Sequence, residues 1–166
     1  MRLLRVVRDH GPDGAWIAAG FVRNAVWDAL HGCREPTPLS DIDVLYFDTQ
    51  CLDLQADFAW ERRLAEVCPD APWSVRNQAR MHFRNADPAY RDCADAMSHW
   101  PEVCTAVALR LRAESLELLA PLGIDDLWAL RVRPTEHFRS KPHLYRERIT
   151  AKNWSARWPK LSIETL

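Results

Sequence analysis

The spacing of hydrophobic positions changes several times in the first half of the chain, and each change marks the boundary of an expected element. Residues 15–19 form a short apolar run that stops at Gly20, which predicts a buried strand. From Phe21 onward, apolar residues recur at helical spacing until Gly32, which predicts a helix with a glycine C-cap. Residues 41–47 alternate and are rich in β-forming side chains, which predicts a second strand.

The remaining elements follow from weaker patterns. We expect helices over residues 2–9, 53–68, 92–100, 123–131 and 139–158, and a strand over residues 73–78. Two interpretations stay open for residues 103–120: a β-hairpin made of 105–111 and 116–120, or a single helix. Strands that alternate with helices and are followed by mixed elements predict an α/β (α+β) fold class.

Composition narrows the class of protein. A length of 166 residues predicts one domain, 1–166, whose basic and mainly helical segment 131–166 packs on the rest. No apolar run approaches the roughly 20 residues of a membrane-spanning helix, and the N-terminus lacks a signal-peptide pattern, so we expect a cytoplasmic protein with no membrane partner. The five scattered cysteines include no CxxC pair, which predicts buried, reduced thiols rather than a zinc site or disulfides.

The net charge of −1 conceals an uneven distribution. Residues 131–160 contain nine Lys or Arg and two Glu, a local balance of +7, whereas the rest of the chain carries −8. Trp154 and Trp158 lie within this basic segment. These tryptophans either stack on nucleotide bases or fix a C-terminal helix to the body while the cations face water.

The most informative residues are Asp41 and Asp43. Alternate residues of a strand share one face, so the two carboxylates would project together while Ile42, Val44 and Tyr46 pack behind them. Two adjacent acids repel each other near a core unless a cation neutralises them, and a hard dication such as Mg²⁺ suits oxygen ligands. The alternative is that Asp41 belongs to a turn and Asp43 is simply solvated.

The turn at Gly20 supplies a second chemical feature. A strand that ends in glycine and leads directly into a helix lets the backbone approach a phosphate and directs free N–H groups at it. Arg23 and Asn24, in the first helical turn, would add charge and hydrogen bonds. The alternative is an ordinary turn in which Arg23 is solvated and Asn24 caps the helix.

These features belong to a longer pattern that resembles a known family. The stretches that carry the resemblance are AAGFVRNAVWDALHG, SDIDVLYFD, WSVRNQARMH, WPEVCTAVALRL, APLGIDDLWALRVRPT and a final set of residues, Lys141, Tyr145, Arg148, Trp154, Trp158 and Pro159. They cover residues 15–160 and resemble a small bacterial nucleotidyltransferase-like family of unassigned substrate, within the DNA polymerase β-like nucleotidyltransferase superfamily. The resemblance implies a mixed sheet flanked by helices, with a C-terminal helical segment.

The resemblance also implies a reaction and a site. The expected activity is metal-dependent transfer of a nucleotidyl group from an NTP to an unknown acceptor hydroxyl on a small molecule, protein or RNA, with release of pyrophosphate. Asp41 and Asp43 would be the catalytic residues and would bind Mg²⁺ or Mn²⁺. The expected nucleotide-binding residues are Gly20, Phe21, Arg23, Asn24, Asn77 and Arg80.

Two positions depart from the family pattern. The usual Gly-Gly or Gly-Ser is Gly20-Phe21 here, and the third strand offers the neutral Asn77 where active members often carry a third carboxylate. The second hypothesis is therefore a catalytically weak or inactive nucleotide-binding or interaction module of the same fold. A third is an RNA-binding protein that uses the basic C-terminal segment.

Overall fold

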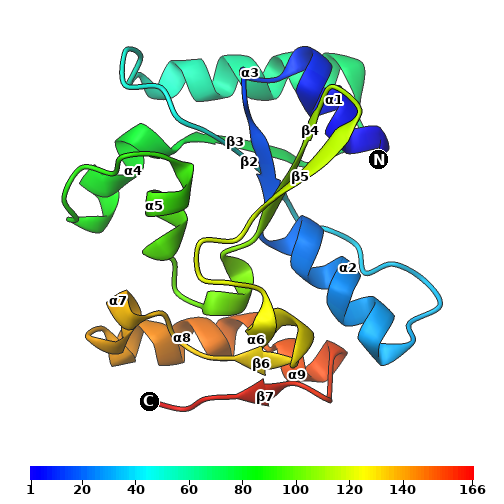
Figure 1. Ribbon diagram of the computed structural model, residues 1–166, viewed down its shortest axis with the longest axis vertical. Coiled ribbons are helices and arrows are strands. Elements are labelled where there is room, and N and C mark those ends of the chain that lie inside the picture. Colours follow the sequence, from blue (N-terminus) through cyan, green and yellow to red (C-terminus); the bar gives the residue numbers. More distant parts are fainter.

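The computed structural model describes residues 1–166 and is built around a five-stranded sheet (Figure 1). The strand order is β3-β2-β1-β4-β5; β2 and β3 run parallel, and the other neighbours are antiparallel. The strands are β1 (Trp16–Ala18), β2 (Ile42–Tyr46), β3 (Trp73–Asn77), β4 (Ala108–Arg112) and β5 (Ser115–Leu119). This mixed sheet with flanking helices confirms the expected α+β class.

Helices pack against the sheet from several directions. Figure 1 shows α1 (Arg2–His10) and α3 (Leu54–Val67) together at the top, and α4 (Gln78–Asn85) and α5 (Cys93–Ser98) at the left. Helix α2 (Gly20–His31) leaves the end of β1. The short helix η1 (Val103–Thr105) precedes β4. The elements after β5 form the C-terminal segment: α6 (Asp125–Trp128), β6 (Arg131–Val132), α7 (Glu136–Arg139), α8 (Pro142–Lys152), α9 (Trp154–Arg157) and β7 (Ser162–Ile163).

The alternation of β2 sets the two faces of the sheet. Ile42, Val44 and Tyr46 are buried in the core between the sheet and the helices α1 and α3. Leu45 is buried on the opposite face, in a cluster that includes residues of α5. Because alternate strand residues share a face, Asp43 lies on the side of Leu45.

The C-terminal segment is fixed to α2 by a group of tryptophans. Trp27 of α2 is wholly buried and makes edge contacts with Trp154 and Trp158, at ring-centroid distances of 5.5 and 5.1 Å. Such aromatic pairs contribute beyond the area they bury. The structure thus confirms that these tryptophans fix the basic segment to the body, and they are not free to stack on bases.

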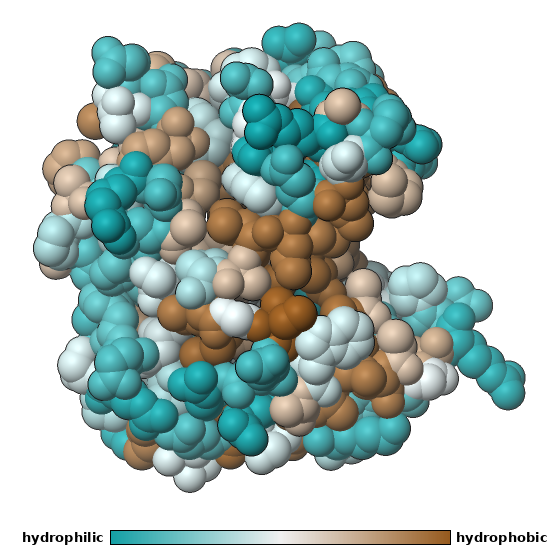
Figure 2. Space-filling view, in the orientation of Figure 1, coloured by the Kyte–Doolittle hydropathy of each residue, from teal (hydrophilic) through white to brown (hydrophobic).

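The outermost strand leaves apolar side chains uncovered. Leu116 and Leu118 of β5 are about half exposed, and Figure 2 shows apolar surface, in brown, in the middle of this face of the molecule. None of the helices is both long enough and apolar enough to cross a membrane.

Most elements expected from the first half of the chain are confirmed, and so is the hairpin between residues 105 and 120. The expected helix 139–158 is instead two helices, α8 and α9, preceded by α7, which ends at Arg139. Pro142 begins α8, and Asn153 adopts a left-handed conformation (φ 43°) after it. The expected helix 123–131 shortens to α6, after which Leu130 also has positive φ. Helix α4 was not predicted, because its sequence has no apolar stripe. All five thiols are free, but Cys33 is only half-buried and Cys51 is exposed, which corrects their expected burial.

Asn77 is a structural residue that joins three parts of the chain. Its Oδ1 accepts hydrogen bonds from the N–H groups of Asp48 and Ala79, both at 3.0 Å, and so caps α4. Its Nδ2 donates to the carbonyls of Asp48 (2.7 Å) and Cys51 (2.9 Å). The side chain is wholly buried, and all of its hydrogen-bonding groups are used.

Replacing this amide by an acid is expected to destabilise the fold. In Asn77→Asp, an oxygen would face two carbonyls in place of the two donated hydrogen bonds, so the free energy of unfolding should fall by about 2–4 kcal/mol in urea titrations. The control is Gln50→Glu on the exposed loop, expected to change stability by less than about 0.5 kcal/mol. An unchanged stability for Asn77→Asp would contradict this structural role.

Candidate active site

The turn between β1 and α2 is strained and leaves backbone donors open. Ala19 has φ 49° and ψ −116°, a conformation that residues with a Cβ rarely adopt. Its carbonyl accepts the N–H groups of Val22 and Arg23, at 3.1 and 2.9 Å. The N–H groups of Gly20 and Phe21 therefore come before the first bonds of the helix and point out of its positive end.

A cavity of about 240 Å³ lies at this helix start and brings the predicted features together. Its walls include Gly20, Arg23 and Asn24 of α2 together with Asp41 and Asp43. The two acids thus lie beside the Gly20 turn, as the sequence predicted. Phe21 is different: its side chain packs against two core clusters and is not part of the cavity lining.

The two acids have unlike surroundings. Asp41 precedes β2, is exposed and accepts a hydrogen bond from the Ser40 hydroxyl at 3.0 Å. Asp43 is half-buried and has no hydrogen-bond donor from the protein. Burial first, and repulsion by Asp41 second, raise the pKa of Asp43 to about 6, although Arg23 and Lys152 counteract this. A cation bound between the two acids would therefore stabilise their ionised forms.

Arg23 is a buried cation without an acidic partner. Its side chain lies over the rings of Trp154 (4.6 Å) and Trp27 (5.2 Å), and its Nη2 donates to Asn24 at 2.9 Å. No carboxylate lies within ion-pair distance, and Nε has no acceptor. Burial lowers the pKa of Arg23, with partial compensation from the charges of Glu102 and Asp43. A desolvated guanidinium at a cavity wall suits an anion. Because Arg23 is buried and Asn24 makes no capping hydrogen bond, the alternative of an ordinary turn does not hold.

A second cavity, of about 420 Å³, adjoins the first and shares Asp43, Ala19 and Arg148 with it. The parallel register pairs Asp43 with Ser74 and Leu45 with Arg76, so β3 places Ser74 and Arg76 on the face of Asp43. The structure therefore corrects the prediction for Asn77, which lies on the opposite face. The β3 side chains on the face of Asp43 are thus a serine and an arginine, and neither is an acid.

Arg80 is also absent from both cavities. Its guanidinium is paired with the wholly buried Asp57 of α3, whose carboxylate also accepts from the hydroxyl of Tyr46 at 2.7 Å. Burial and Asp57 raise the pKa of this tyrosine. Arg80 thus stabilises the packing of α3 and α4 and lines neither cavity, unlike the position expected for a nucleotide-binding residue.

Several lining residues were missed by the sequence reasoning. Arg148 of α8 borders both cavities and pairs with the buried Glu102 at 2.5 Å; Lys152, one turn later, borders the smaller cavity. Arg84 of α4 borders the larger one. Their positions depend on helices that fold back from distant parts of the chain. The sequence signals were the excess of basic residues after 131 and, for Arg148, its place in the family pattern, whereas Arg84 had no such signal.

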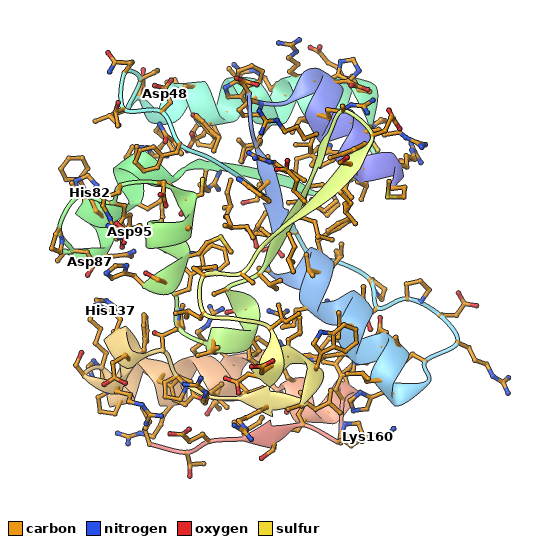
Figure 3. The ribbon with its side chains drawn as sticks, viewed as in Figure 1. Asp48, His82, Asp87, Asp95, His137 and Lys160 are labelled. Atoms are coloured by element: carbon orange, nitrogen blue, oxygen red, sulfur yellow. The ribbon has the colours of Figure 1, made fainter.

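A polar contact lies close to two residues of the larger cavity. Figure 3 shows Asp87, after α4, and His137, in α7, on neighbouring segments at the left, with 3.2 Å between Asp87 Oδ1 and His137 Nε2. Burial lowers the pKa of His137, which favours the neutral ring. His99 and Phe138, next to this contact, line the cavity.

The donor set of the site suits phosphates and one kind of metal. No group of three or more His, Cys, Asp or Glu side chains is arranged for a metal ion, so Asp41 and Asp43 are the available pair. Two carboxylates are what Mg²⁺ usually takes from a protein, with waters and substrate phosphates as the other ligands. Free N–H groups, Arg23 and Lys152 complement phosphate charge.

Comparison with solved structures shows a relative of similar length. An NMR structure described as revealing a CCA-adding enzyme head domain shares 37% sequence identity, with a TM-score of 0.87; the match covers 100% of this chain and 89% of that one. No curated protein matches the sequence.

Larger proteins share the fold alone. A structure described as a tRNA-processing enzyme in an apo form is 16% identical, with a TM-score of 0.57, and the match covers 98% of this chain and 44% of that one. A complex of a CCA-adding enzyme with CTP is 13% identical, with a TM-score of 0.57, and the match covers 90% of this chain and 36% of that one. The chain thus spans less than half the length of these two proteins.

A family model described as nucleotidyltransferase matches residues 5–163. This match takes in β1, α2 and β2, the elements that carry the glycine turn and both acids, as well as most of the C-terminal segment. Since it spans nearly the whole chain, the protein belongs to this nucleotidyltransferase family.

Proposed function

We propose that this protein is a metal-dependent nucleotidyltransferase that transfers a nucleotidyl group from an NTP to an acceptor hydroxyl. The observation that carries the proposal is the smaller cavity, where Asp41 and Asp43 meet the N-terminus of α2 and the unpaired Arg23. An acid pair and an anion site that share one cavity suit a metal–triphosphate complex. Family membership and the CTP complex of a protein with the same fold support an NTP as the donor.

The positive groups of the smaller cavity would bind the donor's phosphates. The N–H groups of Gly20 and Phe21 and the guanidinium of Arg23 would hold the β- and γ-phosphates, and Lys152 would add a second cation. These groups are fixed before the ligand arrives, so they stabilise the charge that develops on the pyrophosphate without reorganising. Asn24 would orient Arg23 through their hydrogen bond.

Asp41 and Asp43 would hold Mg²⁺ or Mn²⁺ on the side facing the α-phosphate. The bound dication would neutralise phosphate charge and orient the acceptor oxygen for displacement at phosphorus. Burial of Asp43 makes its carboxylate a stronger partner for a cation, because less water competes. The remaining requirement is positioning, which phosphoryl transfer demands more than covalent chemistry.

A second candidate function is an NTP-binding module without turnover. It is favoured by β3, which presents Ser74 and Arg76 rather than an acid on the face of Asp43. Both candidates require metal-dependent NTP binding, and only the first requires release of pyrophosphate. Analysis of the products with Mg²⁺ or Mn²⁺ and a panel of acceptors separates them.

The first test removes one carboxylate without removing its volume. Asp43→Asn is expected to abolish the thermal stabilisation by NTP with Mn²⁺ or Mg²⁺, a stabilisation that amounts to about 2.7 kcal/mol when ligand is 100-fold above Kd. The ligand-free variant should be at least as stable as the wild type, because the amide avoids the burial of charge. The control is Asp70→Asn, at an exposed acid, which should keep the full stabilisation. Unaltered metal-dependent stabilisation in Asp43→Asn would refute the proposal.

The second test concerns the buried cation. Arg23→Gln is expected to weaken NTP binding about tenfold or more, because a charge-assisted contact to phosphate is lost. Its ligand-free stability should change by no more than about 1 kcal/mol, since the glutamine removes an unpaired buried charge. Calorimetric binding and urea unfolding measure the two effects. A large loss of stability with unchanged affinity would show that Arg23 is purely structural.

The raised pKa of Asp43 sets a pH dependence. An acid whose pKa rises from 3.8 unfolded to about 6 folded binds more protons in the native state between these values, so it lowers stability as pH increases through this window. The ligand-free wild type should therefore lose stability relative to Asp43→Asn between about pH 4 and 6, by about 3 kcal/mol at most. Stabilisation by Mn²⁺ with NTP should rise over the same window as the proton leaves. Unfolding curves at a series of pH values measure both; parallel profiles for the two proteins would contradict the assignment.

A further inference from the structure

The larger cavity has a fixed relation to the smaller one, because Asp43 is a wall of both. In the proposed function the donor's leaving pyrophosphate lies on the side of Arg23. The attacking and leaving oxygens of a phosphoryl transfer lie roughly in line, on opposite sides of the phosphorus. The acceptor hydroxyl must then enter from the side away from Arg23, and the larger cavity borders Asp43 without including Arg23 in its lining.

One side of this cavity is apolar. Leu45 of the sheet, Met81 of α4, Trp100 and Phe138 contribute hydrophobic surface to a volume of about 420 Å³. Ligand pockets for small molecules typically begin at about 300 Å³ and combine apolar walls with a few polar groups. The cavity therefore suits a small acceptor with an apolar portion.

The charges of the cavity leave one cation without a partner. Asp43 is the only acid in the wall, and three arginines also line it. The guanidinium of Arg76 is held by Glu61 (2.6 Å) and by the Val75 carbonyl, and that of Arg148 by Glu102. Arg84 forms neither a hydrogen bond nor an ion pair within the protein.

Helix α4 presents Arg84 together with other ligand-type side chains. Gln78, Met81 and Asn85 follow the spacing of one helical face, and Arg84 borders that face. The Asn77 cap and the Arg80–Asp57 pair fix the helix to the sheet from its other side. The free guanidinium is thus carried by a firmly positioned element.

We infer that the larger cavity is the acceptor subsite and that it takes a small hydroxyl compound bearing an anionic group, which Arg84 pairs. The anion is a phosphate or a carboxylate, since a guanidinium binds both. This inference rests on the proposed function for the direction of attack, whereas the anion site itself rests on the cavity and its unpaired arginine.

The three methionines allow a direct test by NMR. In protein labelled with ¹³C at the methionine methyls, Met81 reports the cavity, the wholly buried Met97 reports the core and the exposed Met1 is a reference. Phenyl phosphate and phenylacetate, each added separately, should shift the Met81 signal, and neutral benzyl alcohol at equal concentration should not. Comparing the two anions shows which group the subsite prefers.

Variants decide whether Arg84 is responsible. Arg84→Gln should raise the apparent Kd of the preferred anion about tenfold or more, because a charged hydrogen bond is removed. The control, Arg62→Gln at an exposed cation of α3, should leave it unchanged. Three results would overturn the inference: no Met81 shift with either anion, equal shifts with benzyl alcohol, or unaltered affinity in Arg84→Gln.

A parallel titration with Mn²⁺ and α,β-methylene-ATP separates this inference from the proposed function. The expected result is metal-dependent stabilisation with little change at Met81. If the analogue itself fills the cavity and displaces the anion probe from Met81, the cavity holds the donor's nucleoside and the acceptor role is overturned. If the anions bind through Arg84 but no metal-dependent nucleotide binding occurs, the proposed function fails and the acceptor role with it, leaving an anion site.

Discussion

The burial of Ile42, Val44 and Tyr46 beneath α1 and α3 is the constraint on which the site depends. Because strand side chains alternate, this burial forces Asp43 onto the opposite face, toward α5 and the two cavities. A shift of one residue would turn the acid into the core, where an unpaired charge is very costly. The hydrophobic core thereby positions a catalytic candidate that it does not contact.

The same region holds opposite charges that are desolvated but not paired. Burial raises the pKa of Asp43 and lowers that of Arg23, so each charge is less stable than it would be in water. Their effects on each other are secondary to burial. A ligand that supplies a dication to the acids and phosphates to the guanidinium would relieve both, which is the physical basis of the proposed function.

The C-terminal segment contributes to the site as well as to the fold. Packing of Trp154 and Trp158 on Trp27 brings α8 across the helix start, where Arg148 and Lys152 join the cavity walls. Part of the basic excess is neutralised internally, as in the contact of Arg148 with Glu102. The positive charge of this segment is therefore divided between internal ion pairs, the candidate site and exposed side chains such as those of Arg146 and Lys160.

The sequence by itself determined the features that depend on neighbouring residues. The alternation around Asp41 and Asp43, and the change of period at Gly20, are local patterns, and both held in the structure. The unpredicted α4 shows the limit of this reasoning, because the helix has no apolar stripe. Asn77 caps this helix, and only the structure shows that the same side chain also bonds the loop at Asp48. Only the tertiary structure decided which face of β3 meets Asp43, because alternation gives parity within a strand but not the register between strands. In the candidate site, Ser74 and Arg76 therefore lie where the sequence reasoning expected Asn77, and Arg80 lies outside it. The structure adds Arg84, Arg148 and Lys152 to the cavity walls, and their positions are set by helices packed from distant parts of the chain.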